Sequence, residues 1–402
     1  MKNIIKFFVL KSNYKFLFLI ALVTGVCCCL PKGDGSVAIV DVGGNKVAVL
    51  NLNELKTDVA TIPLSSLVEY CNLVQLESIK GAYVDPWAVT VSDKYIGIKQ
   101  PRRGPYVLFD RTGKFLCNVG SFGGGPGEYS SPIWDDIIDD ENELIYLVGV
   151  FTDRIFVYHT SGQFLKEIVL PHRMLHPSIF LDNNILIVIH VPLEKQAKIF
   201  QFDVNTGELV KELVPPVHFF TKRLDGENVV LSTRNKPGFF DFHSFSNDSL
   251  YHFDLKNNRI APIFTMPFST SQNILKRYML LNKDLLLTYI RCLEESGQCA
   301  GTGLVAIDLK HKTSSFVNFA NDFFGNLPAP VDFYFYYLQN GYWTQSMMPE
   351  ELMEEIEKRL TERGLSESDR EVLKKTLSTL KEGANNVVFF GKLKDEVKTK
   401  LW

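Results

Sequence analysis

Hydrophobic and polar positions beyond about residue 70 alternate in short runs broken by turn residues, which is typical of β-strands. One unit recurs, consisting of an apolar strand, a polar turn and a second strand. Its copies are "YVLFDRTGKFLCNVG" (106–120), "RIFVYHTSGQFLKEIVL" (154–170), "KIFQFDVNTGELVKEL" (198–213), "SLYHFDLKNNRIAPIF" (249–264) and "GLVAIDLKHKTSSFVNF" (303–319). The turn carries an aspartate at 110, 203, 254 and 308, and a histidine at 159. A spacing of about 45 to 55 residues is typical of a β-propeller, with four strands in each blade.

Each recurring unit follows a second pair of strands. These upstream halves are "AVTVSDKYIGIKQ", "IWDDIIDDENELIYLVG", "PSIFLDNNILIVIHV", "HFFTKRLDGENVVLSTR" and "YMLLNKDLLLTYIR". With strands named A to D, five blades fit between residues 87 and 320, and "NGYWTQSM" with "NNVVFFGKLK" indicates a sixth. The segment "CNLVQLES" (71–78) stands where a D strand would precede blade 1. We therefore expect an all-β, six-bladed propeller over 66–402, closed by pairing of 71–78 with the C-terminal strands, after a linker over 30–65.

One segment has helical spacing instead. In 348–383, Leu352, Ile356 and Leu360 form one apolar stripe and Leu373, Leu377 and Leu380 form another. Gly364 separates the stripes, and Ser368 with Glu371 matches a capping box. The pattern predicts a small helical hairpin over 349–382, inserted in the last blade. Its leucines are expected to pack on the propeller, and docking of a partner is the alternative.

The N-terminus has the pattern of a targeting segment. Four lysines in the first fifteen residues precede the apolar run "FLFLIALVTGV", which ends at the cluster Cys27, Cys28 and Cys29. This cluster resembles the end of a bacterial lipoprotein signal, which implies a signal peptide over 1–29 and a lipid on one of the three cysteines. An uncleaved N-terminal anchor is the alternative. In either case, the body of the protein is expected outside the cytoplasm, where disulfides are permitted.

Composition narrows the function. The chain has 402 residues, a net charge of −3 and 46% hydrophobic residues, which argues against disorder and against a basic nucleic-acid-binding face.

Cys292 and Cys299 bracket a polar loop, so they are either a disulfide pair or two free thiols. No histidine lies beside them at ligand spacing, and the sequence predicts neither a metal site nor another cofactor there.

No catalytic motif is found. The chain lacks a G-x-S-x-G elbow, an H-E-x-x-H pair and a P-loop. The glycine-rich stretch "SFGGGPGEYSSPIW" (121–134) contains Pro126 and is followed by a strand, whereas a phosphate-binding loop leads into a helix. We interpret it as the crossover from blade 1 to blade 2, tied to its neighbour by Glu128 and Tyr129.

These features together resemble the six-bladed β-propeller lipoproteins of Bacteroides-type bacteria, distant relatives of NHL-repeat propellers. The resemblance rests on "LFDRTGKFL" followed by "GGGPGEY", on "NDSLYHFDL" and on "NNVVFFGKLK". It implies a secreted, membrane-anchored propeller of the cell envelope and brings no catalytic residues.

Strand order divides the connections between two faces of the propeller. The A–B and C–D turns are short and generic, whereas the B–C loops vary and share the other face with the D-to-A crossovers. Loops on a rigid scaffold often bind ligands, so we expect the site on the B–C face. The candidate residues are Arg102, Arg103, Arg154, His190, Arg234, His243 and Arg291. Such residues suit a glycan, an acidic small molecule or an envelope protein.

Two further pairs lie at the starts of A strands. Trp87 and Trp134 occupy equivalent positions in successive blades, and we expect them to pack in the core. Asp135 and Asp136 could place one carboxylate at the central channel, although neighbouring strand residues point to opposite faces.

The leading hypothesis is a lipid-anchored binding protein of the cell envelope. The alternative is a propeller enzyme, such as a lactonase-like hydrolase or polysaccharide lyase with a metal in the channel. A third hypothesis is a structural partner that uses the helical hairpin.

Overall fold

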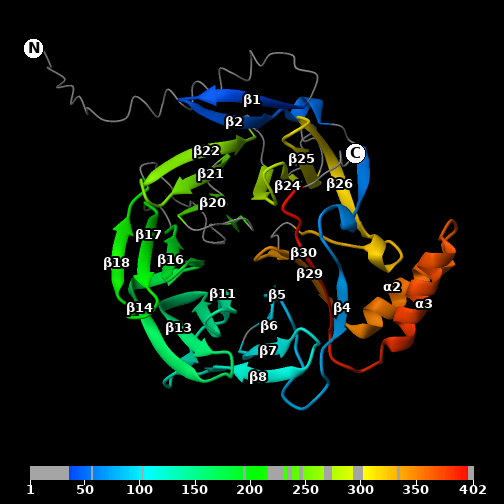
Figure 1. Cartoon of the computed structure of the whole chain (residues 1–402), viewed down its shortest axis with the longest axis horizontal. Helices are drawn as coiled ribbons and strands as arrows, with labels where there is room; N and C mark the ends of the chain where they lie inside the picture. Colours follow the sequence, from blue (N-terminus) through cyan, green and yellow to red (C-terminus); the bar gives the residue numbers. More distant parts are fainter. Residues whose placement is uncertain are drawn as a thin grey trace, which may run out of the picture.

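Six blades surround a central channel in a computed structural model of the chain (Figure 1). The structure describes residues 36–55, 58–101, 103–192, 196–215, 230–232, 238–243, 248–266, 274–292, 302–332 and 336–396. The predicted all-β, six-bladed propeller is confirmed.

The first three blades are regular four-stranded antiparallel sheets with strands in sequence order from the channel outwards. Blade 1 consists of β5 (Ala88–Val91), β6 (Tyr95–Lys99), β7 (Tyr106–Asp110) and β8 (Phe115–Val119). Blade 2 consists of β11 (Ile133–Asp139), β12 (Leu144–Gly149), β13 (Phe151–His159) and β14 (Phe164–Leu175). Blade 3 consists of β15 (Ser178–Asp182), β16 (Ile185–His190), β17 (Lys198–Asp203) and β18 (Leu209–Leu213).

Blades 4 and 5 carry extra strands at their outer edges. Blade 4 consists of β19 (Val230–Leu231), β20 (Phe239–His243), β21 (Ser249–Asp254) and β22 (Arg259–Thr265), extended by β2 (Asn45–Leu50) and β1 (Val37–Val42). Blade 5 consists of β23 (Ile274–Leu280), β24 (Leu285–Cys292), β25 (Gly303–Asp308) and β26 (Thr313–Asn321), with β27 (Leu327–Pro328) and β3 (Val59–Pro63) beside β26. Short 3-10 turns η1 (Leu52–Glu54), η2 (Leu64–Ser66) and η3 (Asp322–Phe324) connect these parts.

The segment predicted to be a linker over 30–65 therefore contains strands. β2 pairs in parallel with β22, and β3 pairs in parallel with β26. The outer strand of a blade has a free row of backbone donors and acceptors, and an added strand satisfies that row. The linker prediction was wrong for residues 37–63, because local alternation does not show which distant edge a strand will cover.

Blade 6 closes the ring as the sequence predicts. It consists of β28 (Leu338–Gln339), β29 (Tyr342–Met347), β30 (Val387–Lys392) and, as its outer strand, β4 (Asn72–Gln75). β4 pairs antiparallel with β30, so two segments about 300 residues apart form one sheet. This pairing confirms the predicted closure by 71–78.

Six hydrophobic clusters, one between each pair of neighbouring blades, make up the core. In β16, Leu186 and Val188 pack toward blade 2, whereas Ile187 and Ile189 pack toward blade 4. Both faces of the strand are buried because side chains alternate along it. This explains why central strands such as "ILIVIH" are continuously apolar.

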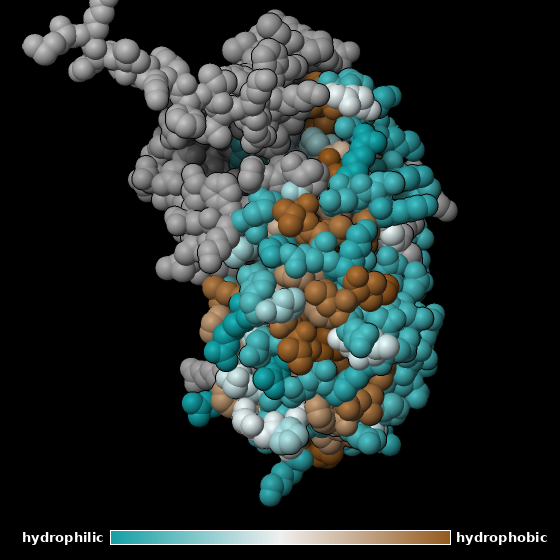
Figure 2. All heavy atoms as spheres, turned by 90° about the vertical axis from the view of Figure 1, so that its left-hand side faces the viewer, coloured by the Kyte–Doolittle hydropathy of each residue, from teal (hydrophilic) through white to brown (hydrophobic). Residues whose placement is uncertain are grey.

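The outward strands of blades 2 and 3 are more mixed. Figure 2 views the ring from the side that carries β14 and β18, where apolar side chains lie scattered among polar ones. The exposed apolar residues of these two strands are Leu165, Val169, Leu209 and Val210.

The predicted hairpin forms two helices, α2 (Pro349–Thr361) and α3 (Glu367–Thr379), between the B and C strands of blade 6 (Figure 1). Leu352, Ile356 and Leu373 are fully buried in the cluster between blades 5 and 6, so the apolar face packs on the propeller as expected. The N-cap of the second helix lies two residues before the predicted one. Ser366, not Ser368, is the N-cap, and its Oγ accepts a hydrogen bond from the backbone N–H of Asp369 at 3.0 Å.

The glycine-rich stretch is a crossover between blades, as predicted. β9 (Ser121–Phe122) and β10 (Glu128–Tyr129) form a short parallel pair there. The Tyr129 hydroxyl accepts a hydrogen bond from the backbone N–H of Tyr106 at 2.8 Å, which ties the crossover to blade 1. Glu128 instead folds back onto its own loop and accepts the N–H of Gly125 at 2.8 Å.

None of the described helices is both long and apolar enough to cross a bilayer.

Candidate functional site in the central channel

The candidate residues on the B–C face do not converge in the described structure. Arg102, Arg234 and Cys299 lie outside the described residues, and of Cys292 only the backbone is described, so the disulfide prediction stays a prediction. Arg103, Arg154, His190, His243 and Arg291 belong to five different blades. No hydrogen bond, ion pair or ring contact joins any two of these five described residues.

Both histidines are buried. His190 ends β16, and its Nδ1 lies 3.1 Å from Nε2 of His172. Burial, reinforced by His172, lowers the pKa of His190 to about 4. His243 lies in β20 and not in a B–C loop as expected, because "FFDFH" forms the B strand of blade 4. Burial lowers the pKa of His243 to about 3, so both imidazoles are neutral at pH 7.

The arginines differ in their surroundings. Arg154 pairs with Asp153 at 3.0 Å and with Glu167 at 2.6 Å. Arg103 is exposed, with its guanidinium 5.1 Å from the ring centroid of Phe122, and Arg291 is exposed on β24. The B–C face remains a predicted site without a described cavity.

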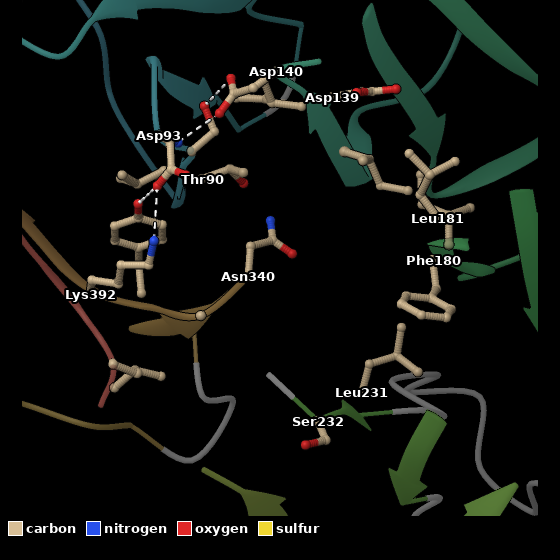
Figure 3. Close-up of a pocket in the computed structure, with 18 of the residues that line it drawn as sticks. Thr90, Asp93, Asp139, Asp140, Phe180, Leu181, Leu231, Ser232, Asn340 and Lys392 are labelled. Carbon is tan, nitrogen blue, oxygen red and sulfur yellow. Dashed lines mark hydrogen bonds and ion pairs between the residues drawn. The ribbon is translucent and has the colours of Figure 1, made fainter. Parts of the chain in front are cut away.

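A cavity of about 560 Å³ lies instead at the opposite end of the channel, which we call the A–B mouth (Figure 3). It is lined by the ends of A strands and by A–B turns from all six blades. The lining residues used below are Thr90, Ser92, Asp93, Asp139, Asp140, Phe180, Leu181, Leu231, Asn340 and Lys392. Its volume falls within the roughly 300–1,000 Å³ typical of small-ligand sites. This site was not predicted from the sequence, because the A–B turns are short and generic. The available signal was the polar pairs "SD", "DD" and "NG" at equivalent turns.

A hydrogen-bond network links three blades along one wall of the cavity. Asp140 of blade 2 accepts the Ser92 hydroxyl at 2.8 Å and the backbone N–H of Asp93 at 2.7 Å, both in blade 1. Asp93 in turn accepts the Tyr342 hydroxyl of blade 6 at 2.5 Å and lies 3.3 Å from Nζ of Lys392. The Tyr342 hydrogen bond, with a smaller contribution from Lys392, holds the pKa of Asp93 below its usual range. This wall is therefore rigid and negatively charged at neutral pH.

A buried charged cluster lies deeper, between blades 1 and 2. Nζ of Lys99 is 2.5 Å from Oδ1 of Asp136, and both side chains are almost fully buried. Asp136 also accepts the Thr90 hydroxyl at 2.9 Å and the Tyr106 hydroxyl at 2.8 Å. Every carboxylate oxygen thus has a donor, as a buried charge requires. Asp136 therefore joins two blades.

Aromatic rings at or just before the starts of four A strands lie close to one another. The Trp87 and Trp134 rings lie 6.0 Å apart, Trp87 lies 5.3 Å from Tyr336, and Trp134 lies 4.2 Å from His176. All four are partly exposed, so the two tryptophans are not fully buried in the core as expected. They form an arc across blades 6, 1, 2 and 3.

The paired aspartates have separate structural partners. As predicted for neighbouring strand residues, Asp136 faces blade 1, whereas Asp135 faces blade 3 and accepts the N–H of Ile179 at 3.0 Å. Burial raises the pKa of Asp135 to about 6. Within the described ranges, no group of three or more His, Cys, Asp or Glu residues is arranged to hold a metal ion.

Comparison with known proteins agrees with this fold. The family model described as a domain of unknown function (DUF4934) matches residues 47–392, and the chain belongs to this family. A protein of Bacteroides fragilis described as exported is similar in structure, with a TM-score of 0.56 at 13% identity over 85% of this chain and 98% of the other. A DUF4221 member from Bacteroides vulgatus gives a TM-score of 0.42 at 10% identity over 80% and 96% of the two chains. No curated protein matches the sequence.

Proposed function

We propose that this protein is an exported, lipid-anchored binding protein of the cell envelope, with its ligand in the cavity at the A–B mouth. Export is supported by the basic and apolar N-terminal pattern and by the structural neighbour that is described as exported. A distant relationship to NHL-repeat propellers is part of the same proposal.

The lipid anchor is tested with the cysteine cluster, which lies outside the described residues. Replacing Cys27, Cys28 and Cys29 together by alanine removes every candidate acceptor. The variant is expected to move from the membrane fraction to the soluble fraction and to lose incorporation of a labelled fatty acid. Unchanged membrane association without fatty-acid labelling of either form would favour an uncleaved anchor.

The cavity carries the binding proposal. All six blades contribute to it, so its shape depends on closure of the ring and not on one mobile loop. The hydrogen bonds that Asp140 and Asp93 accept fix the positions of the turns before a ligand arrives. A preformed site loses less conformational entropy on binding, which favours a binding role.

The proposal is tested by filling the cavity. Leu181→Trp places a large ring at the cavity wall, and Leu209→Trp makes the same change on the exposed outer strand β18. A small-molecule extract of bacterial envelope is incubated with each protein, and retained adducts are measured by native mass spectrometry. Wild type and Leu209→Trp are expected to retain an adduct that Leu181→Trp loses. Equal retention by both variants, or no adduct on any form, would contradict the proposal.

A further inference from the structure

The cavity at the A–B mouth has two unlike walls (Figure 3). Blades 6, 1 and 2 supply the carboxylates and the amide, whereas Phe180, Leu181 and Leu231 of blades 3 and 4 supply apolar side chains. Ser232 lies beside Leu231, and its hydroxyl donates to the Leu280 carbonyl at 2.7 Å. A ligand that fits must therefore be polar along one side and apolar along the other.

The charge of the lining restricts the ligand further. Four lining residues are aspartates and one is a lysine. Asp93 stays ionised because its pKa is lowered, and Asp140 accepts three donors from blade 1, including the N–H of Lys94 at 3.2 Å. These carboxylates cannot donate hydrogen bonds, and together they repel an anion. A neutral or cationic ligand is favoured.

Asn340 provides a polar group that the protein itself does not use. Asn340 and Gly341 have φ values of +49° and +79°, the combination that a two-residue type I′ turn requires between β28 and β29. The turn directs the Asn340 side chain toward the middle of the cavity (Figure 3). Within the described part of the chain, no hydrogen bond occupies its carboxamide, which can both donate to and accept from a ligand.

Phe180 provides an aromatic surface on the other side. Its ring is partly exposed at the cavity, and the ring of Phe240 lies 6.1 Å from it, which supports it from blade 4. An aromatic ring combined with amide and carboxylate acceptors suits a ring that has an apolar C–H face and a rim of hydroxyls.

We propose that the cavity binds a neutral or amino-bearing sugar ring. The C–H face packs on Phe180, and the hydroxyl or amino groups interact with Asn340 and the aspartate wall. This inference rests on the proposed function and adds the ligand class to it. Of the ligand classes expected for the B–C face, it keeps the glycan and rejects the acidic small molecule.

The test uses methyl pyranosides with gluco, galacto and manno configurations, each as the neutral sugar, the 2-amino sugar and the uronic acid. Saturation-transfer NMR titrations of the wild-type protein measure weak affinities directly. For at least one configuration, the neutral and amino forms are expected to bind at least tenfold more tightly than the uronic acid. Equal or tighter binding of the uronic acid, or no binding across the panel, would overturn the sugar assignment.

Two variants locate the binding. Asn340→Gly keeps a residue suited to positive φ and removes the amide, and Phe180→Leu removes the ring; each is expected to weaken the best sugar at least tenfold. Phe180→Tyr is expected to retain binding. Asn258→Gly, at another positive-φ asparagine in the C–D turn of blade 4, is the matched control and is expected to bind like wild type. Unaltered affinity in both test variants would place the sugar elsewhere.

The two proposals can fail separately. If Leu181→Trp loses an envelope adduct while every sugar fails to bind, the cavity is a ligand site of another class. If neither assay depends on the cavity, both proposals are wrong.

Discussion

The buried pair Lys99–Asp136 allows a quantitative test of how blades 1 and 2 are joined. Replacing Lys99 by methionine keeps most of the side-chain volume but removes the ammonium 2.5 Å from Asp136. The carboxylate would retain the hydroxyls of Thr90 and Tyr106 as donors and would have no countercharge. Breaking a pair this deeply buried typically costs about 3–5 kcal/mol, a large part of the roughly 5–15 kcal/mol that stabilises a typical domain.

The assay is equilibrium urea unfolding followed by tryptophan fluorescence, with Trp87 close to the site, where its ring centroid lies 5.9 Å from Nζ of Lys99. Lys99→Met alone is expected to lose about 3–5 kcal/mol. The double variant Lys99→Met/Asp136→Asn, which leaves no buried charge at the pair, is expected to be more stable than Lys99→Met. A loss below about 1 kcal/mol, the usual value for an exposed pair, would refute the interpretation. Additive losses in the double variant would also refute it.

Three further perturbations follow from the same geometry. In Gly97→Ala, the new Cβ would lie 1.7 Å from the Tyr106 hydroxyl, so Tyr106 must move away from Asp136 and the melting temperature should fall. The control Gly124→Ala, whose new Cβ has no atom within 4 Å, should melt like wild type. Burial raises the folded-state pKa of Asp135 to about 6, from about 3.9 in a free side chain. The contribution of Asp135 to the free energy of unfolding is therefore fully present below about pH 4, and it is lost as the pH rises through about 6. Asp135→Asn should flatten this part of the stability profile measured by urea unfolding, and an unchanged profile would argue against a buried, titrating Asp135. Deleting residues 70–78 removes β4 from blade 6 and should abolish a single cooperative thermal transition, whereas an unchanged transition would show that ring closure does not depend on β4.

Local repetition was enough to predict most of the ring. The turn aspartates explain why the repeat is visible. Asp203 accepts the N–H of Asn205 at 2.8 Å, and Asp110 accepts that of Thr112 at the same distance. In the copy with histidine, Nδ1 of His159 accepts the N–H of Ser161 at 3.0 Å. A short side chain with an acceptor stabilises each C–D turn, so the residue recurs along the chain.

The sequence did not predict features that depend on distant pairing. β2 and β3 read as linker, because nothing in their alternation identifies β22 and β26 as partners. In blade 4, Val230–Leu231 is the A strand β19, although "VVLSTR" was expected as the B strand; this shift of one strand placed His243 in a loop. The cavity was missed for a similar reason. Asp93, Asp140 and Asn340 stand in separate short turns, and only closure of the ring brings them around one space.

The central claim is that a ligand occupies the cavity at the A–B mouth. Hydrogen–deuterium exchange measured by mass spectrometry, with and without the envelope extract, compares both mouths of the channel in one experiment. Slower exchange is predicted for 90–93, 137–140 and 340–342, which line the cavity. Slower exchange confined to 103–105 and 150–154 on the B–C side, with no change around the cavity, would contradict the account.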